Sequence, residues 1–155
     1  MRNKNKGFTL IELLVVIAII GLLASVVLLA LNSARAKARD AKRLADVRQL
    51  ASAFELFFND QSSYPTVAAN TILGGAIIGS PALSPNYVGL IPTEPQPADG
   101  TCTATGVNSN QYFMLKNRYN PVDDKTSVYT ITFCLGAQTG GYSAGPHTLT
   151  PAGIQ

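Results

Sequence analysis

The sequence predicts an α+β protein, in which one long N-terminal helix precedes a small antiparallel sheet. Three observations support this fold class. A short basic leader is followed at once by a long apolar segment. A second segment then continues with helical periodicity, and without Pro or Gly, as far as Asn59. Strand-like alternation is confined to the last third of the chain, so the helix and the sheet are segregated along the sequence, as in α+β folds.

Residues 1–7 form the leader, and residues 8–31 form an apolar run of 24 residues in which Glu12 is the only charged side chain. As a helix, this run would be roughly 36 Å long at about 1.5 Å per residue, which is enough to cross a bilayer. A core helix of a soluble protein would show a polar stripe, and this run has none. We therefore predict that residues 8–31 span a membrane.

Two simpler interpretations remain open for this segment. One is a secretory signal peptide cleaved near Ala36, although its apolar region would be longer than is usual. The other is a plain anchor in which Glu12 marks the water interface. A carboxylate inside hydrocarbon costs on the order of 2.5–3.5 kcal/mol, so it normally has a partner or a function. Cleavage after Gly7 would give Phe8 a new amine four residues from Glu12, where the sequence otherwise offers no cation.

The stretch Gly7-Phe8-Thr9-Leu10-Ile11-Glu12, set between the basic leader and the apolar run, resembles the prepilin motif of type IV pilins and type II secretion pseudopilins. The resemblance implies a pilin-like fold, cleavage between Gly7 and Phe8 by a prepilin peptidase, and N-methylation of Phe8. It also implies that Glu12 acts in filament assembly. The implied partners are further copies of the chain, the peptidase, an inner-membrane assembly platform, and membrane lipid before assembly.

The charge pattern limits the possible partners, and it conflicts with the family resemblance about which side of the membrane the head lies on. The formal charge is +3, but without the three cations of the leader nine basic residues face nine acidic ones. We therefore predict no nucleic acid partner. The cations between Arg35 and Arg43 would place the head in the cytoplasm by charge bias. The resemblance places the head outside instead, and we follow it: a single-pass precursor in the cytoplasmic (inner) membrane, then an extracellular or periplasmic filament.

Residues 32–60 are predicted to continue the helix in amphipathic form and to end at the polar residues 60–63. Steps of three and four place one apolar set on a single face, widened by Leu50 and Phe57: Leu44, Val47, Ala51, Phe54 and Phe58. The opposite face is expected to be solvated, and it carries the charged residues Arg39, Asp40, Lys42, Arg43, Asp46, Arg48 and Glu55. For the Arg/Lys cluster at 35–43 the alternatives are binding of anionic lipid head groups and pairing with acids of neighbouring subunits.

Residues 61–155 are predicted to form the globular head. Residues 62–110 are rich in Pro and Gly and are read as turns; within them, Ser63–Thr66 and Leu90–Pro95 are also similar to segments of pseudopilins and pilins. Strands are expected at 111–116 and 128–135, joined by a hairpin loop at 120–125, with one more short strand around Thr148. The side chains expected to face the helix alternate along the second strand: Tyr129, Ile131, Phe133 and Leu135.

Few residues suggest other chemistry. Cys102 and Cys134 would close a 33-residue loop if they form a disulfide, stabilising the head by about 3–4 kcal/mol, and two unpaired thiols are the alternative. His147 is expected in a surface loop, and we predict no catalytic residue, cofactor or metal. The acidic and amide residues that invite a calcium interpretation lack the spacing of a defined calcium loop, so a solvated turn is preferred: Asp99, Asn120, Asp123 and Asp124.

Taken together, the sequence predicts a structural subunit of a type IV pilus or of a type II secretion pseudopilus, rather than an enzyme. The subunit would polymerise through its N-terminal helix after removal of the leader. The alternative is a membrane-anchored binding module that does not polymerise, or a minor pilin that acts in adhesion or DNA uptake.

Overall fold

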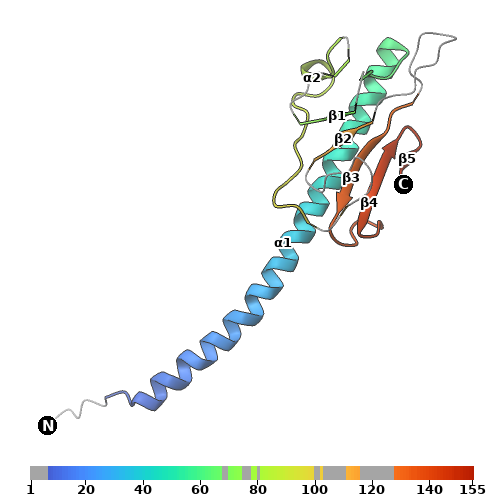
Figure 1. The fold of residues 1–155 in the computed structure, drawn as a ribbon. Coiled ribbons are helices and arrows are strands. Elements are labelled where there is room, and N and C mark those ends of the chain that lie inside the picture. The colour runs from blue at the N-terminus through green and yellow to red at the C-terminus, as the bar shows by residue number, and fades with distance from the viewer. Residues whose placement is uncertain are drawn as a thin grey trace. The chain divides into compact units, whose positions relative to one another are not determined.

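A computed structural model describes residues 7–67, 70–74, 78–79, 81–99, 102, 111–115 and 128–155. The chain divides into two compact units, Met1–Arg35 and Ala36–Gln155. The helix α1, Leu10–Gln61, runs through both (Figure 1). The predicted α+β class is confirmed, because α1 precedes an antiparallel sheet of five strands.

The first unit contains the apolar part of α1. Every described residue from Gly7 to Arg35 is exposed in the single chain, including the large side chains of Leu22, Leu29 and their neighbours. Within the part of the chain that the structure describes, α1 is the one helix long and apolar enough to cross a membrane. An apolar surface of this extent requires lipid or other helices around it.

The second unit is built on the sheet, whose strands are adjacent in the order β1-β2-β3-β4-β5, each antiparallel to its neighbour. Their bounds are β1 Thr71–Ile72, β2 Phe113–Met114, β3 Ile131–Leu135, β4 Gly145–Thr150 and β5 Gly153–Ile154. The strands predicted at 111–116 and 128–135 correspond to β2 and β3. Their predicted pairing is confirmed, since Met114 lies opposite Ile131. The predicted hairpin loop at 120–125 lies outside the described residues.

The C-terminal tail contains more structure than the sequence indicated. The single short strand expected near Thr148 is the six-residue β4, which pairs along its length with β3, and β5 follows it. Gly153 opens β5 with a φ of 111°, a conformation that other residues rarely adopt, so the turn after β4 depends on glycine there. A short helix, α2 Leu83–Asn86, also lies in the region read as turns.

The hydrophobic core lies between α1 and one face of β3. It contains the predicted helix residues Leu44, Val47 and Phe54. The four strand residues expected to face the helix are all buried in the same core: Tyr129, Ile131, Phe133 and Leu135. The rings of Phe54 and Tyr129 meet edge to face, with centroids 4.6 Å apart. The prediction was wrong for Phe58, which is 37% exposed and instead contacts the ring of Tyr64.

We expect Phe54→Ala to destabilise the head by about 3–5 kcal/mol, because it removes a fully buried ring and leaves a cavity against Tyr129. The matched control is Leu56→Ala on the same helix, which is 55% exposed and should change stability by about 0.5 kcal/mol at most. Urea unfolding of the detergent-solubilised chain measures both. Equal losses in the two variants would contradict the assigned core face.

Candidate functional site

The first candidate site is the start of α1, where Thr9 and Glu12 form reciprocal hydrogen bonds. The Thr9 backbone N–H and its hydroxyl both donate to Glu12 Oε2, at 2.9 and 2.7 Å. The Glu12 backbone N–H donates in return to Thr9 Oγ1 at 3.3 Å. This arrangement is a capping box, in which a Thr at the N-cap and a Glu three residues later satisfy helix-end groups that would otherwise lack partners.

The capping box changes the description of Glu12. The sequence offers this acid no nearby cation, but the structure gives it two neutral donors from Thr9. Both bonds fall on Oε2, so neither uses Oε1. An open, mainly apolar groove of about 390 Å³ runs beside the carboxylate, lined by Phe8, Ile11, Val15 and Val16. Glu12 is therefore held in a fixed position with one oxygen that Thr9 does not use.

The second candidate site is a buried charge cluster in the head, centred on Arg43. Its side chain is completely buried, and its guanidinium donates to Glu94 Oε1 at 2.8 Å and to Asp40 Oδ1 at 2.6 Å. It also donates to Asp99 Oδ2 at 3.1 Å and to the Pro95 carbonyl at 3.1 Å. One guanidinium from α1 thus holds the 94–99 segment through several bonds.

Asp40 and Arg39 extend the cluster to other elements. The two carboxylate oxygens of Asp40 accept the backbone N–H groups of Gly136 and Ala137, at 3.0 and 2.9 Å, just after β3. Arg39 forms a two-bond ion pair with Asp99. A Cβ at Gly136 would clash with the side chain and backbone of Asp99, so glycine is required for this close approach. The cluster therefore links α1, the 94–99 segment and the end of β3.

The prediction that the polar face of α1 is solvated was wrong for the buried Asp40, Arg43 and Asp46. It holds for Lys42, Arg48 and Glu55, which are exposed. Asp46 accepts a hydrogen bond from the buried Tyr112 hydroxyl at 2.9 Å. Helical periodicity separates apolar from polar positions, but it carries no information about a loop that later covers the polar stripe with its own acids and carbonyls.

The charges in the cluster shift two carboxyl groups in opposite directions. The hydrogen bonds from Arg39, with those from Arg43, hold the pKa of Asp99 below its usual value. Burial raises the pKa of Glu94 to about 7, against the opposing attraction of Arg43. The Asp99 contribution to stability is consequently present at neutral pH and lost as pH falls. The Glu94 contribution is largest below the ordinary pKa of a glutamate and is lost as pH rises through about 7.

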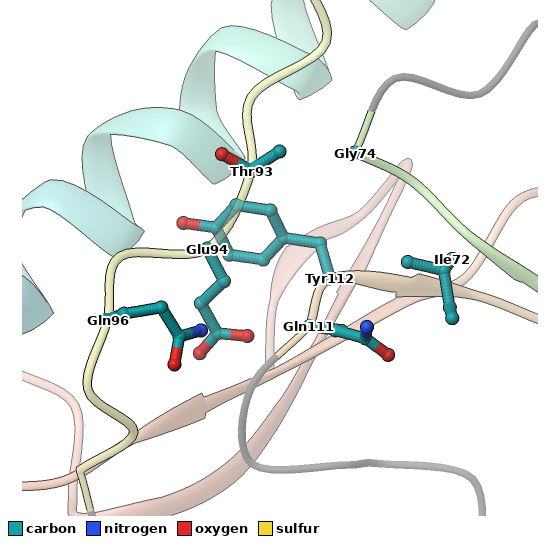
Figure 2. Close-up of a pocket in the computed structure, with 7 residues that line it drawn as sticks. All are labelled: Ile72, Gly74, Thr93, Glu94, Gln96, Gln111 and Tyr112. Carbon is teal, nitrogen blue, oxygen red and sulfur yellow. The ribbon is translucent and has the colours of Figure 1, made fainter.

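A cavity of about 290 Å³ lies beside Glu94 (Figure 2). Glu94 Oε2 is buried and is the one buried side-chain oxygen or nitrogen, among the described residues, that has no hydrogen-bond partner. In Figure 2 the carboxylate points between the side chains of Gln96 and Gln111. The residues that line the cavity are Ile72, Gly74, Thr93, Glu94, Gln96, Gln111 and Tyr112.

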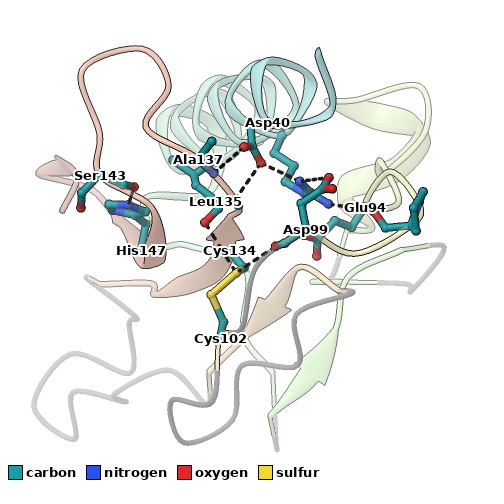
Figure 3. The surroundings of a disulfide bond; sticks show 12 residues. Asp40, Glu94, Asp99, Cys102, Cys134, Leu135, Ala137, Ser143 and His147 are labelled. Carbon is teal, nitrogen blue, oxygen red and sulfur yellow. Dashed lines mark hydrogen bonds and ion pairs between the residues drawn. A yellow bond between two sulfur atoms is a disulfide. The ribbon is translucent and has the colours of Figure 1, made fainter. Parts of the chain in front are cut away.

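The remaining sequence candidates that the structure describes are held in structural contacts. Cys102 and Cys134 are joined by a disulfide, with Cα atoms 6.1 Å apart and both side chains buried (Figure 3). His147 was expected in a surface loop, but it lies in β4 and is buried, with its ring nitrogens 2.8 and 3.2 Å from the carbonyls of Ser143 and Gln155. Asp99 is paired with arginines, and the other three calcium candidates, Asn120, Asp123 and Asp124, lie outside the described residues.

Comparison with known proteins identifies a family motif in the N-terminal segment. A family profile described as the prokaryotic N-terminal methylation motif matches residues 2–28. The type II secretion system core protein G of Dickeya chrysanthemi is 32% identical over 114 residues, covering 68% of this chain and 72% of that protein. Its namesake from Klebsiella michiganensis is 33% identical over 113 residues, covering 68% of this chain and 78% of that protein.

The type IV wide pilus major component PilA4 of Thermus thermophilus is 36% identical over 115 residues, covering 74% of each chain. The chain belongs to the family of type IV pilins and type II secretion pseudopilins. The predicted family is therefore confirmed, and this pilin-family protein is a structural subunit of a pilus or pseudopilus. No solved structure matches the chain.

Sequence reasoning missed two features of this pilin-family subunit. The first is the capping box, whose signal was present, because Thr9 and Glu12 have the spacing of the motif. The second is the Arg43 cluster, for which only the Asp40–Arg43 spacing on one helix gave any indication. Its other acids, Glu94 and Asp99, come from a segment more than fifty residues away.

We expect Arg43→Ala to destabilise the head by about 3–5 kcal/mol, because it leaves buried carboxylates without their cation. The matched control is Lys42→Ala at the neighbouring exposed position, which should change stability by about 0.5 kcal/mol at most. Urea unfolding measures both variants at pH 7. A loss for Arg43→Ala no larger than that for Lys42→Ala would show that the cluster does not hold the head together.

Proposed function

We propose that this subunit polymerises through α1 after cleavage between Gly7 and Phe8, with N-methylation of the new Phe8 amine and pairing of Glu12 with a terminal amine of a neighbouring copy. The observation that carries the proposal is the position of Glu12. It is an acid at the start of an exposed apolar helix, with one carboxylate oxygen that the capping box does not use. The match of the methylation motif to residues 2–28 supports the same processing.

The energetics favour assembly as the role of this acid. In the membrane precursor, the two hydrogen bonds from Thr9 reduce the cost of placing Glu12 among apolar side chains. In a bundle of helices, the amine of a neighbouring Phe8 would add a charge-assisted bond on the remaining oxygen. Assembly would also cover the exposed residues of the first unit, which a single chain leaves to lipid.

We further propose that the head lies outside the cytoplasm, so that the precursor is a single-pass protein of the cytoplasmic membrane. The disulfide between Cys102 and Cys134 supports this orientation, because disulfides persist in oxidising compartments. The partners in this scheme are a prepilin peptidase, an inner-membrane assembly platform and further copies of the chain. The filament is then periplasmic if it serves secretion and extracellular if it is a pilus.

Mass spectrometry of the native protein tests the processing step. We expect a mature chain that begins at Phe8 and carries one additional methyl group on its N-terminal amine. Chain produced in a host without a prepilin peptidase is the control and should retain Met1–Gly7. A native protein that keeps its leader would overturn the proposal and leave a membrane-anchored, non-polymerising module as the function. A native protein that begins near Ala36 would also overturn it, because the apolar segment would have been removed as a signal peptide.

The role of Glu12 is tested by Glu12→Gln, which preserves side-chain length and hydrogen bonding at the capping box but removes the charge. We expect unchanged membrane anchoring and processing, with filament yield reduced at least about tenfold. The reason is that an unpaired buried amine costs several kcal/mol, and about 1.4 kcal/mol already corresponds to a tenfold change. Sheared filaments quantified against total subunit provide the measurement, with Ser25→Ala in the same apolar run as control. Wild-type yield from Glu12→Gln would rule out charge pairing as the driving contact.

A further inference from the structure

The cavity beside Glu94 combines three features that no fold requirement explains. A completely buried carboxylate has one oxygen bonded to Arg43 and the other without a partner. A cavity of about 290 Å³ adjoins it. Its wall includes neutral polar side chains at Thr93, Gln96 and Gln111. A buried oxygen without a partner is normally destabilising, so its presence beside a cavity points to a ligand.

The charge balance specifies the sign of that ligand. The cluster contains three carboxylates, Asp40, Glu94 and Asp99, and two guanidiniums, Arg39 and Arg43. When Glu94 is ionised, one negative charge is in excess, and the oxygen that lacks a donor belongs to Glu94, which lines the cavity. A cation with N–H donors would supply both the missing charge and the missing hydrogen bond.

The lining favours an ammonium group over a metal ion. Among the described residues there is no group of three or more His, Cys, Asp or Glu side chains that could hold a metal. The cavity instead offers one carboxylate oxygen together with the amide oxygen of Gln111 and the hydroxyl of Thr93, which accept N–H bonds, and an ammonium has three donors to distribute among them. The volume lies just below the range of drug-sized sites, which suits a small group.

We propose that this cavity binds a primary ammonium group, supplied either by a small free amine or by a lysine side chain of a second copy of the chain. Thr93 and Gln96 line the cavity and are exposed, so the cavity opens to solvent. Lys37 and Lys42 are exposed lysines on α1 that a second copy would present. The second source rests on the proposed filament, whereas the first does not.

Protonation of the Glu94 carboxylate competes with the binding of an ammonium group. The charged groups that act on Glu94 are Arg43 and Asp40 from α1 and Asp99 from its own segment, and the nearby Tyr112 is bonded to Asp46. Because burial raises the pKa of Glu94 to about 7, the carboxylate is mostly ionised at pH 8 and mostly protonated at pH 6. Ammonium affinity should therefore fall about tenfold between pH 8 and pH 6.

Methylammonium is the probe, titrated into the full-length, disulfide-intact chain in detergent and followed by the NMR signals of the Gln96 and Gln111 side-chain amides. We expect saturable shifts that weaken at pH 6, and none with tetramethylammonium at equal ionic strength, because that ion has no N–H donor. Absence of saturation, or equal shifts from tetramethylammonium, would overturn the proposal.

Two variants assign the response to the carboxylate. Glu94→Gln retains an oxygen for Arg43 and should raise the methylammonium Kd at least tenfold. Gln111→Leu leaves Arg43 untouched and should weaken binding several-fold, so the site remains testable if Glu94→Gln does not fold. The matched control is Glu55→Gln, an exposed carboxylate bonded to Tyr64, which should leave the Kd unchanged. Undiminished binding in Glu94→Gln would overturn the proposal.

A lysine of a second copy, as the source of the ammonium group, is tested in filaments assembled from mixed ¹⁴N and ¹⁵N subunits. Carbodiimide treatment would join a carboxyl and an amine that are in contact, with loss of water, and a mixed-isotope peptide joining Glu94 to a lysine would identify the second copy as donor. Methylammonium binding without this peptide assigns the site to a free amine. If the chain does not polymerise, only this cross-linking experiment is lost. The methylammonium titration needs no filament, so failure of the proposed filament is distinguishable from failure of the cavity to bind an amine.

Discussion

The buried guanidinium of Arg43 is the interaction on which the head depends. The hydrophobic core holds α1 against β3, but it does not fix the 94–99 segment, which has no helix or strand of its own. Arg43 reaches this segment through Glu94, Asp99 and the Pro95 carbonyl, and Asp40 binds the backbone after β3. Since buried charges are tolerated only when they are paired and hydrogen-bonded, this cluster specifies one arrangement of its three elements.

Two acids of α1, Asp40 in the middle of the helix and Glu12 at its start, illustrate different ways to satisfy a carboxylate. Asp40 is satisfied by a cation and by two backbone N–H groups, and its requirements are met within one chain. Among the residues that the structure describes, the donors to Glu12 are the neutral N–H and hydroxyl of Thr9, and both bond to the same carboxylate oxygen. The first arrangement is complete in the monomer and serves the fold. The second is incomplete in the monomer, which is the property expected of a residue that acts between subunits.

Much of the fold was predictable because local signals agreed with tertiary packing. The apolar run, the helix face carrying Val47 and Phe54, and the alternation along β3 each follow from a periodicity that a single segment displays. Thr9 and Glu12 also carried a local signal, the capping-box spacing, which sequence analysis did not use. The exposed position of Phe58 was missed because a helical face is broader than the part of it that the sheet covers.

The cluster and the cavity could not be predicted, because their partners are distant in the sequence and their polarity is atypical of a core. Asp40 and Arg43 have the composition of a solvated stripe, and only the folded position of Glu94 and Asp99 gives them a buried environment. His147 in β4 is a comparable case, since its two ring nitrogens lie beside two carbonyls that no spacing rule connects to it. In each case the local pattern fixes which groups are polar, and the tertiary fold decides whether water or protein satisfies them.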